Sequence, residues 1–271
     1  MRREGNRDVA EAISDRQVVA VLRPFVRACG PMLDALRESD PFGLQARARR
    51  EETDDLAGVE SGLKAKLIHG VTSVKVPGTA AWARMTGYDR SSWWMNRVGR
   101  FTALLTSIPG LGGALADRLP VQDALGTASQ GLLLCAIAGE YGVTDVGTRV
   151  RLIAWVLFER DIDPDLAAGK HPDHNEAAEA DEAAKLTEEL TESEKKHGKA
   201  TVKAAASTLW RLGRGLLAIT GELEKRPRGN FLHRAIGMLP VVGAAGDYLG
   251  ERSGLRVAWK RAHVWLTEHR G

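Results

Sequence analysis

Apolar residues recur at helical spacing along most of the chain. In residues 202–223 the interval between them alternates between three and four, which predicts a long helix with a packing seam on one side. The residues of this seam are Val202, Ala205, Leu209, Leu212, Leu216, Ile219 and Leu223. Residues 7–29 predict an amphipathic helix, which Pro24 should kink or shorten, and a short second helix is expected after Gly30 and Pro31. Further helices are expected over residues 79–86, 97–107, 123–141, 148–158 and 247–268.

Two apolar blocks rich in Gly and Ala, residues 98–141 and 232–254, form the predicted core. Within them, residues 108–117 and 239–247 share one order: an apolar residue and Pro, then small and apolar residues, then Asp. The simplest interpretation is a helix, a Pro/Gly turn and a second helix with Asp near its start. The alternative is a hairpin that inserts partway into a membrane. The predicted fold class is therefore an all-α helical bundle built from two Pro/Gly-interrupted apolar hairpins.

Small residues at intervals of four mark one side of the long helix in each block. Such a stripe lets the backbone of another helix approach closely, so we expect these positions to pack helices together. They are Gly131, Cys135 and Gly139 in the first block, and Gly246, Gly250 and Gly254 in the second.

The chain divides into four predicted regions, and the last two differ in charge. Residues 1–60 read as N-terminal amphipathic helices, and residues 61–158 and 201–271 as the two halves of the helical core. Between them, residues 159–200 carry thirteen acidic and six basic side chains and few large apolar ones, which predicts an acidic linker or insertion that is partly disordered. Residues 201–271 carry five acidic and twelve basic side chains, so the acidic tract either attracts this basic end or leaves it to an anionic partner.

The last helix combines a basic stripe with apolar residues and Trp, a pattern that suits an anionic membrane surface. The alternative is a docked helix whose basic side pairs with the acidic tract. The adjacent Trp93 and Trp94 cannot both face one core, so one is expected at an interface, or one buried and the other half-covered. Either Ser91 or Ser92 is a suitable N-cap for their helix. The candidate surface contacts are Arg252, Arg256, Lys260, Trp259, Trp265, Trp93 and Trp94.

The composition is that of an ordinary globular protein, with 44% hydrophobic and 27% charged residues among 271. Cys29 and Cys135 form no CxxC motif and lie in apolar contexts, which predicts buried free thiols in a reducing compartment. The N-terminus lacks the apolar segment of a secretory signal, and the longest uncharged runs are shorter than the roughly 20 residues that a membrane span needs. A cytoplasmic protein that can lie against a membrane is therefore expected.

No catalytic constellation stands out. Walker A, GxSxG and HExxH motifs are missing from the sequence. Residues 161–165 imitate the start of a calcium loop, but Leu166 and Pro172 stand where Gly and Glu are needed. His171, Asp173 and His174 are expected to be solvated, and the remaining histidines, among them His69, His233 and His263, to be surface or packing residues. No cofactor or metal is predicted, and the one polar set considered for a site is Asp117, Asp123 and Asp247.

Several short runs resemble the EcsC-like family of bacterial helical proteins. They are LPVQDA at residues 119–124, IAGEYG at residues 137–142, Thr148-Arg149 before an apolar helix, and PVVGA followed by Asp247. The resemblance covers about residues 61–158 and 201–262, whereas the acidic tract departs from the family pattern. It implies a helical protein linked to an ABC-transporter locus and to secretion, and it offers no catalytic residues.

Taken together, these features predict a non-enzymatic, peripherally membrane-associated protein that regulates or scaffolds a transport or envelope system. Its partner would be an anionic membrane surface or a membrane protein. The alternative is a soluble enzyme or small-molecule binder that uses Asp117, Asp123 and Asp247 in a cleft between the hairpins. Nucleic-acid binding is disfavoured because the basic stripe belongs to no recognisable binding fold. The oligomeric state stays open.

Overall fold

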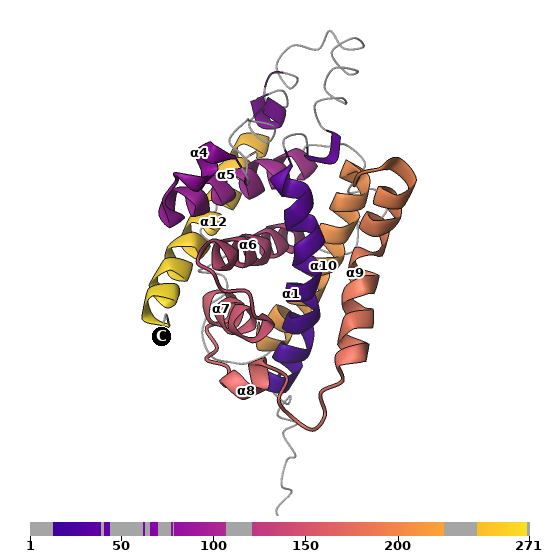
Figure 1. Ribbon diagram of the computed structural model, residues 1–271, viewed down its shortest axis with the longest axis vertical. Coiled ribbons are helices and arrows are strands. Elements are labelled where there is room, and N and C mark those ends of the chain that lie inside the picture. Colours follow the sequence, from indigo (N-terminus) through magenta and orange to yellow (C-terminus); the bar gives the residue numbers. More distant parts are fainter. Residues whose placement is uncertain are drawn as a thin grey trace, which may run out of the picture.

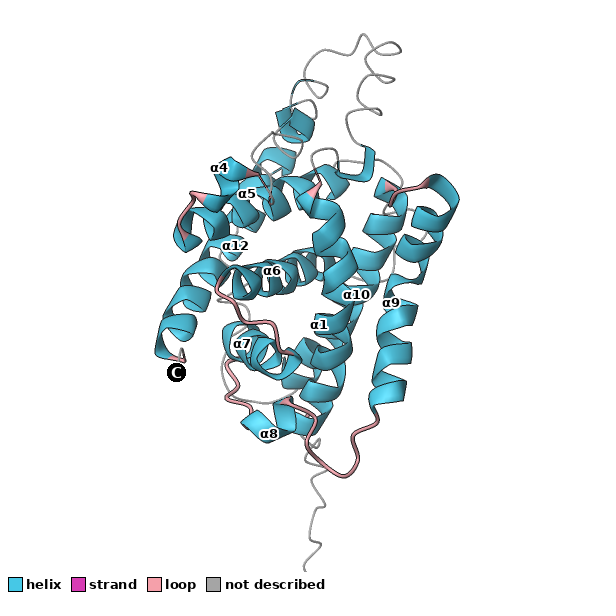
Figure 2. Ribbon diagram, in the orientation of Figure 1, coloured by secondary structure: helices cyan, strands magenta, loops and turns pink. Residues whose placement is uncertain are grey.

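The computed structural model describes residues 13–38, 41–43, 62, 66–69, 77, 79–106, 121–224 and 243–269, with the backbone alone for 121–122, 220–224 and 243–252. Over this part of the chain every regular element is a helix (Figure 2). The predicted all-α fold is confirmed. The two Pro/Gly turns of the predicted hairpins, at residues 107–120 and 225–242, lie outside the described residues, as does most of residues 39–78.

Helix α6 (Val121–Glu140) occupies the centre of the molecule. It contacts α1 (Asp15–Arg37), α5 (Gly87–Thr106), α7 (Val146–Phe158), α10 (Val202–Glu224) and α12 (Gly243–Glu268), which surround it in Figure 1. A helix that is apolar on all sides needs such an environment. Seven consecutive residues of α6 are almost fully buried: Leu132, Leu133, Leu134, Cys135, Ala136, Ile137 and Ala138.

The acidic tract forms part of the fold. Its residues build α8 (Pro164–Ala167) and α9 (Glu176–His197), and α9 packs against α1 and α10. Asn175 caps the start of α9, and Gly198 ends it in a left-handed conformation. The prediction of a partly disordered linker is wrong, because an outer helix needs only a narrow apolar stripe: Ala183, Thr187 and Leu190 at intervals of four and three.

Helix α1 runs unbroken through both of its prolines. Ser14 and Gln17 cap its start reciprocally, and Pro24 and Pro31 lie inside it. The prediction that Pro24 shortens this helix and that a second one begins after Gly30 is wrong. Each proline removes one backbone hydrogen bond, and the contacts of α1 with α6, α7, α9 and α10 compensate for that loss.

The start of α5 also differs from the prediction. Thr86 precedes the helix, and its backbone N–H and hydroxyl both hydrogen-bond to the carboxylate of Asp89. The Thr86 hydroxyl in turn accepts from the backbone N–H of Asp89. Ser91 and Ser92 therefore lie one turn inside the helix and do not cap it. The short helix expected over residues 79–86 is confirmed as α4 (Ala80–Ala83), which Thr79 caps.

The packing seam of α10 is confirmed, since Val202, Ala205, Leu209, Leu212, Leu216 and Ile219 are all buried. The closest approach on α10 falls at Gly213, where an added β-carbon would lie 2.1 Å from the carbonyl oxygen of Ala124 on α6. At Gly131 the close neighbour is a side chain and not a helix backbone, because a β-carbon there would lie 2.5 Å from the ring of Phe25 on α1.

The other predicted small residues show looser contacts. A β-carbon at Gly139 would meet only the Arg149 side chain, at 3.5 Å, so no helix backbone approaches this position. At Gly254 it would lie 3.1 Å from the side chain of Gln130 on α6. The surroundings of Gly246 and Gly250 lie outside the description.

None of the helices over the described residues combines the length and the apolar character that crossing a bilayer requires.

We predict that Gly213→Ala destabilises the protein by about 3 kcal/mol, because the new methyl group must displace the backbone of α6. Gly215→Ala is the matched control on the same helix. Its β-carbon would lie 3.5 Å from Val21, an ordinary contact, so we expect no loss, or a gain of up to about 1 kcal/mol from helix propensity. Urea unfolding followed by circular dichroism measures both. Equal stability of the two variants would show that α6 and α10 do not depend on this contact.

Candidate functional site

One side of α12 packs on the core and the other is exposed. Leu255, Ala258, Ala262, Trp265 and Leu266 are buried against the neighbouring helices α5, α6 and α7. The opposite side presents two cations and two valines in one row: Arg256, Val257, Lys260 and Val264, here called the α12 face. Each valine is 50% exposed. In the described part of the chain, only three large hydrophobic side chains are exposed, and these valines are two of them.

The cations of the α12 face have no acidic partner among the described residues. Arg256 and Lys260 form no ion pair there, although the whole acidic tract is described. Figure 1 shows the reason, since α9 and α12 lie at opposite edges of the molecule. The alternative that the basic stripe pairs with the acidic tract is therefore wrong for these two residues. Only their neighbour Arg261 reaches that tract, with an ion pair of 2.9 Å to Glu159. The side chain of Arg252 lies outside the description.

An aromatic cluster borders the α12 face. Tyr88, at the start of α5, is 57% exposed, and its ring packs edge-on against Trp259 at a centroid distance of 4.8 Å. His263 lies between Trp259 and Tyr141, at 4.4 and 5.3 Å from their rings. The aromatic rings make this border apolar, while their N–H and O–H groups are polar. Side chains of this kind are typical of interfaces.

Ser91 connects this cluster to α5. Its side chain accepts a hydrogen bond from Nε1 of Trp259 at 3.0 Å and lies 3.2 Å from Nε2 of His263. Ser91 is completely buried. Among the described residues, no further side chain completes a catalytic arrangement with it. We therefore interpret the contact as packing between α5 and α12. Sequence reasoning missed this role, because no local pattern joins Ser91 to His263, 172 positions away.

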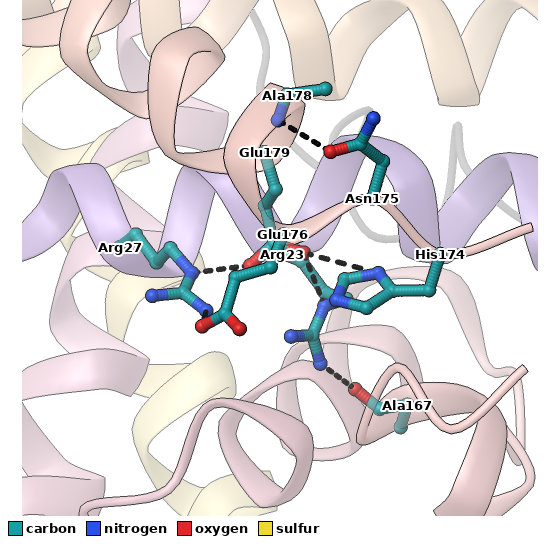
Figure 3. Close-up of polar contacts among 8 residues, drawn as sticks. All are labelled: Arg23, Arg27, Ala167, His174, Asn175, Glu176, Ala178 and Glu179. Carbon is teal, nitrogen blue, oxygen red and sulfur yellow. Dashed lines mark hydrogen bonds and ion pairs between the residues drawn. The ribbon is translucent and has the colours of Figure 1, made fainter.

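A second cluster of charges is buried between α1 and α9. Figure 3 shows Glu179 of α9 reaching toward both Arg23 and Arg27 of α1. Nε of Arg23 donates to the Glu179 carboxylate at 2.5 Å, and its guanidinium also donates to the carbonyl of Ala167 at 2.6 Å. The ring of His174 lies 3.8 Å from the same carboxylate.

The surroundings of Glu179 favour its ionised form. Burial alone would raise the pKa of this carboxyl, but hydrogen bonds and positive charge from Arg23 and Arg27 outweigh it and lower the pKa. The pKa of Arg27 is raised by its hydrogen bond to Glu179, against the opposing effect of burial. Since all these groups are satisfied within the cluster, we interpret it as a tie between α1 and α9 that stabilises the fold.

Arg97 of α5 is a third buried charge. Its guanidinium donates to the carbonyl of Leu36 at 2.9 Å and to that of Glu38, at the C-terminal end of α1, and it lies 4.8 Å from the ring of Trp93. Burial, and secondarily the charge of Arg100, lowers its pKa to about 10. This residue therefore joins α5 to the end of α1.

The predicted surface role is wrong for two of the tryptophans. Trp94 is fully buried and donates from Nε1 to Glu140 at 2.9 Å, and Trp265 is 2% exposed. Trp93 is half-buried and packs edge-on against Trp82 and Trp94, which corresponds to the alternative of one buried and one half-covered indole. Trp259, also half-buried, is the candidate that adjoins the α12 face.

The three Asp residues considered for a polar site belong to the two apolar blocks. Asp123 is exposed in the first turn of α6. Asp117 lies outside the described residues, and for Asp247 the description covers only the backbone. The predicted buried free thiols are confirmed, and burial, followed by a hydrogen bond with Cys135, raises the pKa of Cys29.

Metal-binding side chains do not converge in the described ranges, where no three of His, Cys, Asp or Glu form a group that could hold an ion. His171 and His174, expected to be solvated, are both half-buried, with ring centroids 5.6 Å apart. Asp173 instead pairs with Arg16 at 2.7 Å.

Comparison of the chain with protein-family models, with curated proteins and with solved structures gave no match.

We predict that Glu179→Gln destabilises the protein by about 3 kcal/mol, because it leaves Arg23 buried without a counter-charge. Glu176→Gln is the control: Glu176 also pairs with Arg27, at 3.3 Å, but its side chain is 76% exposed, so less than about 0.5 kcal/mol should be lost. Chemical unfolding at pH 7 compares the two. Similar losses in both variants would contradict a special role for the buried pair.

The pH dependence of stability gives a separate prediction. Because the pKa of Glu179 is lower in the folded than in the unfolded protein, its stabilisation is complete above the ordinary Glu pKa of about 4.3 and is lost as the pH falls through the folded value. Acid should therefore destabilise the wild type more than Glu179→Gln below about pH 4. Unfolding curves at a series of pH values measure this difference, and parallel curves for the two proteins would refute it.

Proposed function

We propose that this protein is a non-enzymatic helical protein that binds peripherally to an anionic membrane surface through the α12 face. There it regulates or scaffolds a transport or envelope system, either directly or through a membrane-protein partner. The observation that carries the proposal is the single row of unpaired cations and exposed valines on α12.

The charge on the α12 face is available to a partner. Arg256 and Lys260 are one helical turn apart, exposed, and without an acidic neighbour among the described residues. A cation near an anionic membrane surface contributes about 1 kcal/mol, so two of them support weak, reversible binding that salt would screen.

The apolar part of the α12 face suits shallow contact. Val257 and Val264 flank Lys260 along the helix and are half exposed, while the rest of the apolar side of α12 is buried in the core. Tyr88 and Trp259 at the border are residue types that sit well at the level of lipid headgroups. A helix docked in this way would lie on the membrane and not enter it deeply.

The resemblance to the EcsC-like family supports the second half of the proposal, because that family is linked to transporter loci and secretion. The competing hypothesis of an enzyme or binder based on Asp residues gains no support from Asp123, the one member of that set whose side chain is described. It is exposed on the first turn of α6.

Flotation with vesicles tests the proposal. Wild-type protein should float with phosphatidylcholine vesicles that contain phosphatidylglycerol, and much less with phosphatidylcholine alone. Arg256→Glu combined with Lys260→Glu should lower the affinity by roughly thirtyfold or more, from about 1 kcal/mol per cation. The control is Lys195→Glu combined with Lys196→Glu, which changes the net charge equally at exposed positions of α9.

Two results would contradict the proposal. One is the absence of flotation for the wild type at low salt. The other is an equal loss of binding in both double variants, which would mean that net charge alone, and not the α12 face, governs any attraction.

A further inference from the structure

Four hydrogen bonds meet around Ser91 and His263 at the border of the α12 face. Nε1 of Trp259 donates to the Ser91 hydroxyl at 3.0 Å, and that hydroxyl donates to the carbonyl of Tyr88 at 2.7 Å. Nε2 of His263 lies 3.2 Å from the same hydroxyl, and Nδ1 of His263 lies 2.7 Å from the carbonyl of Trp259.

The number of protons that these four bonds require determines the protonation state of the His263 ring. A carbonyl oxygen only accepts, so Nδ1 of His263 must carry a proton. The hydroxyl of Ser91 has a single proton, which the short bond to the Tyr88 carbonyl uses. Nε2 can then complete its bond to Ser91 only as a donor. All four bonds therefore exist together only when both ring nitrogens of His263 are protonated.

A neutral ring cannot keep the full set. The Ser91 proton would have to turn from the Tyr88 carbonyl toward Nε2, and the bond of 2.7 Å would be lost. Proton uptake by half-buried His263 thus gains one hydrogen bond at the buried Ser91 hydroxyl, where partial shielding from water strengthens it.

The aromatic surroundings favour the same state. The rings of Trp259, Tyr141 and Tyr88 lie 4.4, 5.3 and 5.8 Å from the imidazole, and π systems at such distances attract a cation. His263 forms no ion pair in the described part of the chain.

The charged groups on the helices packed around His263 are either bonded to other residues or are themselves cations. On α5, Asp89 is bonded to Thr86, and Arg90 lies 3.4 Å from Glu140 at the end of α6. On α7, Arg151 lies over Trp265 at 5.7 Å and is paired with Asp161. On α12 itself the neighbouring charges are Arg256, Lys260 and Arg261, the last paired with Glu159.

We propose that His263 is a proton-responsive element that controls binding at the α12 face. The inference rests on the proposed function, since it concerns regulation of the same surface. Protonation would add a third cation one helical turn after Lys260, at the border where the ring of Tyr88 lies 5.8 Å from the imidazole. Anionic membranes would then bind more tightly as the pH falls.

Vesicle binding at two pH values tests the regulatory step. Between pH 8 and pH 6, we expect the affinity of the wild type for phosphatidylglycerol-containing vesicles to rise about fivefold, the effect of one added cation near the surface. His263→Gln, which cannot take up a proton, should lose most of this rise. His269→Gln is the matched control: Nδ1 of His269 also bonds to the carbonyl four residues before it, at 2.9 Å, but the residue is exposed and has no hydroxyl partner among the described residues.

Nitrogen-15 NMR of the lipid-free protein separates this inference from the proposed function. With all four hydrogen bonds intact, His263 should show a proton on both ring nitrogens, and Ser91→Ala should remove the bond at Nε2. A His263 ring that carries a proton on Nδ1 alone at pH 6, where vesicle binding is measured, would overturn the inference. So would vesicle binding with the same pH dependence in wild type and His263→Gln. If His263 is doubly protonated but the protein binds no vesicles, the proposed function is refuted. The proton-responsive hydrogen-bond network would still be supported by that result.

Discussion

The architecture depends on a close contact between the backbones of α6 and α10. At Gly213 the two helices approach so closely that no side chain fits between Gly213 and the carbonyl of Ala124. This approach brings the buried seam of α10 against α6, and the other sides of α6 are then covered by α1, α5, α7 and α12. A helix as apolar as α6 is stable only when it is surrounded in this way, so the positions of the outer helices follow from the need to bury it. On the side of α6 that faces α1, Gly131 instead leaves room for a side chain, the ring of Phe25.

Buried charges attach the outer elements to this core. Glu179 joins α9 to α1 through two arginines, and Arg97 joins α5 to the end of α1. Such groups are costly to desolvate and stabilise little beyond a well-packed apolar contact, but the loss of one partner is severe. They therefore specify where α9 and α5 dock more than they add to the total stability. The arrangement explains how α9, with a narrow apolar stripe, holds one position on the surface of α1 and α10.

Periodicity was enough to predict the all-α class, the seam of α10, the short helix after Thr79 and the end of α12. It failed where tertiary contacts override local preference. Pro24 is tolerated because four helices hold α1, and the acidic tract folds because Glu179 finds two arginines about 150 positions earlier in the chain. Trp94 looked like an interface residue because the sequence cannot reveal that Glu140, 46 positions away, accepts its N–H. The cations of the α12 face were anticipated from their spacing, whereas the network of Ser91 and His263 was not, since it joins residues 172 positions apart.

Helix α12 carries the α12 face on one side and buried core residues on the other. The packing of this helix therefore determines which of its side chains reach the surface. Leu255, Ala262 and Leu266 hold α12 in place, and their burial fixes which side of the helix carries Arg256 and Lys260. Trp259 and His263 lie on the boundary between the two sides, where Ser91 of α5 and Tyr141 after α6 meet them. A change in the protonation of His263 therefore acts at a position that contacts both the buried network and the exposed row. Ser91 is fully buried on α5, which packs on α6, whereas Trp259 and His263 are half-buried, so the network joins the interior to the edge of the exposed row. The surface charge of the α12 face is for this reason coupled to the interior through one hydroxyl group.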